Sequence, residues 1–152
     1  MPSLDTKHFG RISFESRDLI EFPRGLPGFE GRRRFLAIRQ QRNAPLVFLQ
    51  SLEDPGLCFT TAPVRAVAPR FRLRLSEEDR AAAGLSSVRQ PRIGKDVWAL
   101  AIITVREAGP TANLLAPLVI NLRSLRAVQA VMRESAYSHQ HALPERTETV
   151  CS

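Results

Sequence analysis

Glu53 and Asp54 are adjacent carboxylates, a residue type that can act in acid–base catalysis. On a strand, neighbouring side chains point to opposite faces, so these two groups would not share a proton as a catalytic dyad does. Pro55 and Gly56 follow them, and an acidic residue before Pro and Gly is typical of a tight turn. The segment therefore predicts a turn, and its functional counterpart is an acidic loop that contacts a basic partner.

Metal binding and cofactor chemistry have little support in the sequence. His139 and His141 are spaced to bind a metal together, but no third ligand accompanies them, and no CxxC or HExxH spacing occurs. Cys58 and Cys151 are not expected to form a disulfide with each other. The dinucleotide, P-loop and nucleophile-elbow motifs are also missing from the sequence. We therefore predict a protein that is not an enzyme, with no catalytic residues, metal or cofactor.

A glycine–proline segment predicts a rigid reversal of the chain. Gly25, Pro27 and Gly28 lie within four residues of one another, the composition of a double turn. Phe29 follows directly and is expected to anchor the turn in the core.

A second segment, residues 111–121, places apolar residues between two asparagines. One interpretation is a bend at Asn113 that leads through Pro117 into a buried strand. The other is an exposed apolar shoulder at Leu114 and Leu115, which would favour a partner site. The residues alone leave both interpretations open.

The elements that must position these segments are predominantly strands. Short apolar runs with a period of two are separated by many of the 11 prolines, a pattern typical of an antiparallel sheet or barrel. Strands are predicted at residues 11–15, 19–22, 34–38, 46–52, 57–61, 70–75, 97–106 and 118–122. One short helix is predicted at residues 76–84, with Ser76 as N-cap and Gly84 as C-terminal stop. Residues 125–134 fit either helix or strand.

Length and composition indicate one all-β, mainly antiparallel, barrel-like domain over residues 1–143, followed by a disordered tail at 144–152. The chain has 152 residues and 43% hydrophobic residues. No apolar run is long enough to span a bilayer, and residues 1–10 do not resemble a signal peptide. We expect a cytoplasmic monomer that does not bind membranes.

The net charge of +7 raises a different hypothesis, a basic RNA-binding β-barrel. All but two of the 22 basic residues are arginine, and they are scattered along the chain. Arg70, Arg72 and Arg74 alternate with apolar residues and would lie on one strand face, which could follow phosphates or simply face solvent. Since the chain has one Trp and one Tyr, a base-stacking platform is poorly supported, and direct nucleic-acid binding is not expected.

Four segments in a fixed order resemble the FliW family. They are TKHFG at residues 6–10, FPRGLPGFE at 22–30, LQSLEDP at 49–55 and TANLLAPLVIN at 111–121. The resemblance extends over residues 6–143. It implies a compact antiparallel β-barrel-like fold with little helix, and a late strand at residues 125–134.

The resemblance also implies a function in protein binding. Members of this family bind flagellin before export and sequester the translational repressor CsrA, which relieves the repression of flagellin synthesis. The implied function is therefore that of a flagellar assembly factor with flagellin and CsrA as partners. We expect the contacts at Glu53, Asp54 and Pro55, and at 113–115.

Overall fold

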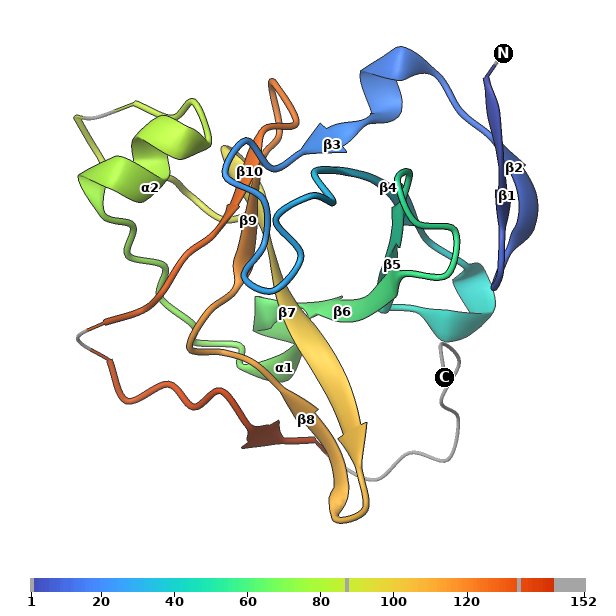
Figure 1. The fold of residues 1–152 in the computed structure, drawn as a ribbon. Coiled ribbons are helices and arrows are strands. Elements are labelled where there is room, and N and C mark those ends of the chain that lie inside the picture. Colours follow the sequence, from blue (N-terminus) through green and yellow to red (C-terminus); the bar gives the residue numbers. More distant parts are fainter. Residues whose placement is uncertain (1, 87, 134, 144–152) are drawn as a thin grey trace.

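The computed structural model describes residues 2–86, 88–133 and 135–143, which form a mainly antiparallel β structure with short helices (Figure 1). The strands are β1 (Ser3–Thr6), β2 (Gly10–Ser13), β3 (Ile20–Glu21), β4 (Arg34–Ile38), β5 (Val47–Ser51), β6 (Cys58–Pro63), β7 (Val97–Arg106), β8 (Gly109–Ala112), β9 (Leu118–Asn121), β10 (Ala127–Gln129) and β11 (His141–Ala142). The α-helices are α1 (Val64–Val67) and α2 (Glu77–Ala82), and the 3-10 helices are Ser16–Asp18 and Gln41–Asn43. The predicted all-β class is confirmed.

Strand β7 organises the main sheet, in which the strands follow the order β10-β9-β7-β6-β5-β4-β3. Its first half pairs with β9, its middle with β6, and its last four residues with β8, all antiparallel. Strand β11 then pairs with β8. The β1–β2 hairpin forms a separate sheet of two strands.

The sheet curves but is not closed into a barrel, so the barrel-like expectation needs correction. Its end strands are β3 and β10, and a single isolated bridge between Glu21 and Arg126 connects the two ends in the described part of the chain. The Glu21 N–H donates to the Leu125 carbonyl at 3.0 Å. Strand β3 has two residues and β10 has three, so these strands are too short for a continuous ladder.

Two hydrophobic clusters lie on opposite faces of β7, because its side chains alternate. Val97, Ala99 and Ala101 belong to the first cluster, whereas Leu100 belongs to the second. The first cluster packs beneath α2 and the residues that precede it. The second holds the aromatic side chains Phe22 and Phe35, whose rings meet edge to face at 5.6 Å.

Helix α2 confirms the predicted helix. The Ser76 side chain accepts a hydrogen bond from the Asp79 N–H, as the N-cap assignment requires. Gly84 follows the C-cap with a φ of +68°. Helix α1, one turn at Val64–Val67, was not predicted.

Residues 70–75 were predicted to be a strand, and this is wrong. Phe71, Leu73 and Leu75 are buried between exposed arginines, so the alternation itself is real. The segment has no strand partner within residues 2–86, 88–133 and 135–143, however, and its hydrogen bonds go to side chains and turns. The late strand implied at 125–134 is confirmed as β10. The tail predicted at 144–152 lies outside the described residues.

Candidate partner-binding surface

The glycine–proline turn at residues 25–30 depends on backbone conformations that favour glycine. Gly25 and Gly28 have φ angles of +68° and +83°. The Gly25 N–H donates to the Phe22 carbonyl at 2.8 Å, and the Phe29 N–H donates to the Leu26 carbonyl at 2.7 Å. A Cβ on Gly25 would lie 2.7 Å from the backbone oxygen of Glu30, so that position has no room for a side chain. The chain reversal is confirmed.

Phe29 lies at the surface of this turn and not in the core where it was expected. It is 38% exposed, and its ring meets Phe59 edge to face at 5.4 Å. Phe59, in β6, also contacts the buried Phe35 at 5.9 Å. The turn therefore exposes part of Phe29 to solvent, while the half-buried Phe59 and the buried Phe35 pack behind it.

The acidic segment forms the turn between β5 and β6. Ser51 Oγ accepts the N–H groups of Glu53 and Asp54 at 3.1 and 3.0 Å. Asp54 Oδ1 accepts the Gly56 N–H at 3.0 Å. The buried Gln50 amide donates to backbone oxygens of the same loop, including that of Pro55 at 3.3 Å. These bonds hold the loop in one shape.

Glu53 is bound to neighbouring arginines. Its Oε1 accepts the N–H groups of Arg33 and Arg34 at 3.1 and 3.0 Å, and its Oε2 lies 2.6 Å from Arg34 Nε. Partial desolvation acts to raise the pKa of Glu53, but the hydrogen bonds and charge of Arg34, with the Arg33 N–H, outweigh it and lower that pKa. Asp54 has a looser partner, with Oδ2 3.7 Å from Arg32. The loop therefore presents mixed charge.

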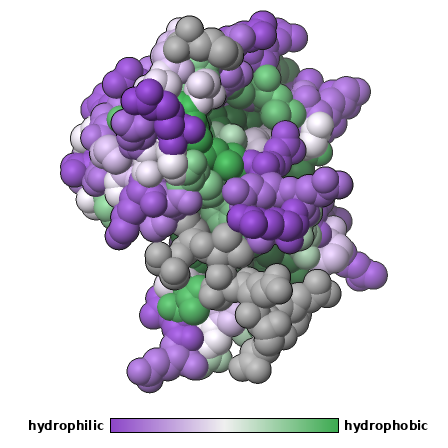
Figure 2. Space-filling view, turned by 90° about the vertical axis from the view of Figure 1, so that its right-hand side faces the viewer, coloured by the Kyte–Doolittle hydropathy of each residue, from purple (hydrophilic) through white to green (hydrophobic). Residues whose placement is uncertain are grey.

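The N-terminal hairpin completes this region. The Lys7 N–H donates to the Pro55 carbonyl at 3.1 Å, and the Phe9 ring lies 5.4 Å from that of the buried Phe48. Figure 2 views the molecule from this side and shows hydrophobic surface between hydrophilic areas near the centre of the face. We define the motif face as Lys7, Phe29, Glu53, Asp54 and Pro55.

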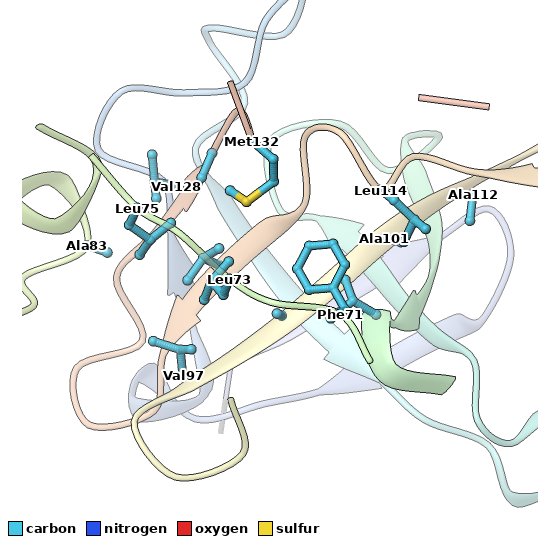
Figure 3. Packing of buried hydrophobic residues seen from close by; sticks show 14 residues of the cluster. Phe71, Leu73, Leu75, Ala83, Val97, Ala101, Ala112, Leu114, Val128 and Met132 are labelled. Atoms are coloured by element: carbon cyan, nitrogen blue, oxygen red, sulfur yellow. The ribbon is translucent and has the colours of Figure 1, made fainter. Parts of the chain in front are cut away.

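The second predicted contact, at residues 113–115, is corrected in part. Leu114 is 2% exposed and belongs to the first hydrophobic cluster, close to Ala101 and Ala112 (Figure 3). Leu115 is half-buried and packs against that cluster. Asn113 Oδ1 accepts the Ala116 N–H at 2.9 Å, which supports the bend interpretation. An exposed shoulder formed by both leucines does not exist.

Asn121, the last asparagine of the same segment, has a structural role that the sequence did not reveal. Its Nδ2 donates to the carbonyls of Ala83 and Gly84 at 2.9 and 3.3 Å, and its Oδ1 accepts the Arg123 N–H at 2.9 Å. The residue is 6% exposed. One amide thus connects the end of α2 to the turn after β9, a contact across 38 positions that no local pattern could predict.

No group of three His, Cys, Asp or Glu side chains within residues 2–86, 88–133 and 135–143 is arranged to hold a metal ion. No helix among them is long and apolar enough to cross a membrane.

Comparison with known proteins identifies the family. The model of the family described as FliW protein matches residues 3–143. The chain belongs to the FliW family. It is 33% identical to the flagellar assembly factor FliW of Syntrophomonas wolfei over 143 residues, covering 91% of this chain and 86% of the relative. It is 31% identical to that of Bacillus licheniformis over 136 residues, covering 88% and 91%. A crystal structure of the flagellar assembly factor FliW superimposes with a TM-score of 0.81 at 27% identity, covering 96% of this chain and all of the other.

The FliW segments divide into two groups in the fold. Residues 6–10 and 49–55 meet directly, through the bond from the Lys7 N–H to the Pro55 carbonyl, whereas residues 22–30 are connected to them through Phe59 and through Arg33, which contacts Glu53. The fourth, at 111–121, supplies core residues and the Asn121 contact. Figure 1 shows the loop after β8 well separated from the loop between β5 and β6. Three of the four FliW segments thus contribute to the motif face, and the fourth stabilises the fold.

Proposed function

We propose that this FliW-family chain acts in the cytoplasm by binding flagellin and, in its flagellin-free form, by sequestering the translational repressor CsrA. Release of flagellin by export would then free the chain to bind CsrA and lift its block on flagellin synthesis. The family assignment supports the flagellar role, and the motif face supplies a surface suited to protein partners. Recognition residues on a rigid scaffold are typically carried by its loops.

The observation that carries the proposal is the partly exposed Phe29 ring on a turn that is followed by Arg32 and Arg33, which contact the loop of residues 53–55. Phe29 is supported from below by Phe59, and the loop is fixed by Ser51 and Gln50. Aromatic residues held in place contribute large contact area at small entropic cost. We assign Phe29 to the flagellin contact, with Glu53, Asp54 and Pro55 at its rim.

Asn113 and Leu115 form a second candidate contact in this proposal, since both are partly exposed. Their distance along the fold from the loop of residues 53–55 favours separate roles for the two regions. A partner that requires both would have to span the sheet. We therefore place the primary contact at the motif face.

Direct RNA binding has weaker support. The Tyr137 ring stacks on Phe71 at 4.4 Å, and its hydroxyl accepts the Arg72 N–H at 2.8 Å. The Trp98 ring is covered by Arg39, whose guanidinium lies 5.0 Å from the ring centre. Both side chains are engaged within the protein, which leaves a base-stacking platform without its best candidates.

The direct test is a calorimetric titration with the flagellin of the same organism, up to tens of micromolar. We expect saturable binding, weakened about tenfold or more by Phe29→Ala, as for an aromatic anchor in a protein interface. The matched control is Val105→Ala, because Val105 is 59% exposed at the far end of β7. Absence of binding by the wild-type protein would remove the proposed function and leave the family assignment in place.

For CsrA, the sharper variant is Asp54→Asn, which removes the charge but keeps an oxygen that accepts the Gly56 N–H. Glu107→Gln is the matched control, an exposed carboxylate with no ion pair among the described residues. If the acidic loop steers association, Asp54→Asn lowers the association rate a few-fold at low salt and flattens its salt dependence. Equal effects of the two variants would assign the change to net charge alone.

A further inference from the structure

A cleft lined by arginines lies beside the extended residues 70–75. Its volume is about 560 Å³, and Arg65, Arg72, Arg74 and Arg92 surround it, with Gln90 and Ile93 also in the lining. None of these residues belongs to the motif face.

The backbone N–H and C=O of one residue at the cleft, Leu73, are available for hydrogen bonds to another molecule. In an extended chain, the N–H and C=O of residues 71, 73 and 75 point to one side. The Phe71 carbonyl accepts from Arg65 at 3.4 Å, and both backbone groups of Leu75 are bound by Gln90. The N–H and C=O of Leu73 have no partner among the described residues. Figure 3 shows Leu73 between Phe71 and Leu75 on this segment.

Gln90 already acts as a short substitute for a neighbouring strand. Its Oε1 accepts the Leu75 N–H at 2.8 Å, and its Nε2 donates to the Leu75 carbonyl at 3.1 Å. A residue opposite Leu75 in an antiparallel strand would exchange the same two bonds. The position next to it, Leu73, offers the same pair to an incoming chain. Unpaired edges of this kind are templates for strand addition.

The charges around this edge are only partly compensated. Arg92 pairs with Asp96 at 3.4 Å, and Arg65 is used on the Phe71 carbonyl. Arg72 and Arg74 are exposed and have no carboxylate within ion-pair distance in the part of the chain that the structure describes. They lie on the same side of the extended segment, two residues apart.

We propose that this cleft binds an extended acidic peptide segment of a partner protein. The partner backbone exchanges two hydrogen bonds with Leu73, and its acidic side chains, at alternate positions, reach Arg72 and Arg74. The paired N–H and C=O of Leu73 match a peptide and not a phosphate backbone, which offers only acceptors. This surface is separate from the motif face and does not depend on the proposed binding of flagellin or CsrA.

The test uses a fluorescein-labelled octapeptide of alternating valine and glutamate, titrated with the full-length protein and followed by fluorescence anisotropy. We expect binding with a Kd on the order of tens of micromolar, typical of a short motif. A peptide with lysine in place of glutamate, and one N-methylated at its valines, should each bind at least about tenfold more weakly. The first change reverses the charge, and the second removes the backbone donors.

The double variant Arg72→Gln with Arg74→Gln should weaken binding of the acidic peptide, with a Kd on the order of tenfold higher. The control is Arg42→Gln with Arg106→Gln, an equal loss of charge at two exposed arginines outside the cleft, which should change the Kd by less than about twofold. Circular dichroism verifies that both proteins are folded.

If the N-methylated peptide binds as tightly as the unmethylated one, the proposed strand addition is wrong. If both double variants weaken peptide binding equally, the peptide does not bind at this cleft. Tighter binding of a single-stranded RNA of the same charge, lost in Arg72→Gln with Arg74→Gln, would replace the peptide site with a nucleic-acid site. The assay contains neither flagellin nor CsrA, so its failure is distinguishable from failure of the proposed function.

Discussion

Glu53 contacts Arg34 through both of its carboxylate oxygens, Oε2 to the guanidinium Nε at 2.6 Å and Oε1 to the backbone N–H at 3.0 Å. Together with the Arg33 N–H, this contact joins the loop between β5 and β6 to the start of β4. The residue that sequence reasoning assigned to partner binding therefore also holds the loop in place.

Replacing Glu53 with alanine should destabilise the protein by about 1 kcal/mol, as the loss of a comparable capping carboxylate does. Glu53→Gln keeps an acceptor for the two N–H groups and should cost less. Chemical denaturation of the three proteins measures the difference. Identical midpoints for wild type and Glu53→Ala would show that the contact contributes nothing to stability.

Stability should also depend on pH through Glu53. Its folded-state pKa is lowered, so the contact contributes stability above the unfolded-state pKa of about 4.3 and loses it as the pH falls through the folded-state pKa. The difference in unfolding free energy between wild type and Glu53→Gln should be constant near neutral pH and shrink below about pH 4. A difference that grows on acidification would contradict the assignment.

The two glycines of the turn at residues 25–30 should respond differently to alanine. Both need a positive φ, which costs about 1 kcal/mol for alanine. At Gly28 a Cβ meets nothing within 4 Å, whereas at Gly25 it meets the Glu30 backbone. Gly25→Ala should therefore destabilise by at least about 2 kcal/mol and Gly28→Ala by about 1. Gly28→Val should exceed Gly28→Ala. Equal thermal midpoints for the two alanine variants would refute the close contact.

Asn121→Ala should cost about 2 to 3 kcal/mol, because the buried Ala83 carbonyl and the partly buried Gly84 carbonyl at the end of α2 lose their donor. Asn113→Ala is the matched control; it removes one partly buried hydrogen bond and should cost about 1 kcal/mol. Urea denaturation measures both. A larger loss in Asn113→Ala would show that the connection through Asn121 is not important.

Periodicity predicted most of the sheet because most strands bury one face. Strands β4 and β7 have the predicted bounds, and β5 and β6 shift by one or two residues. Strands β1, β8 and β11 were missed, since their residues are mostly exposed or half-buried and carry little apolar alternation.

The wrong strand at 70–75 has a specific physical reason. Alternating burial reports that one side of an extended chain packs on a core, as Phe71, Leu73 and Leu75 do. It does not report whether the backbone has a partner strand. Here Gln90 and Tyr137 supply side-chain partners from distant positions, which the local sequence cannot reveal.

At the candidate site, the sequence predicted the turns but not which side chains are exposed. The turn residues Gly25, Pro55 and Gly56 carry local signals that sequence reasoning reads correctly. Whether Leu114 faces the core depends on which elements cover it, and Phe29 is exposed although its type favours burial. Tertiary packing decides both, and it must be seen in the structure.

A competition titration measures whether flagellin and CsrA bind this chain alternately, as the proposed switch between the two partners requires. The complex of this chain with fluorescently labelled CsrA is formed first, and flagellin from the same organism is then added. We predict release of CsrA that follows flagellin occupancy and is weakened in Phe29→Ala but not in Val105→Ala. Simultaneous binding of both partners, with CsrA anisotropy unchanged at saturating flagellin, would contradict it.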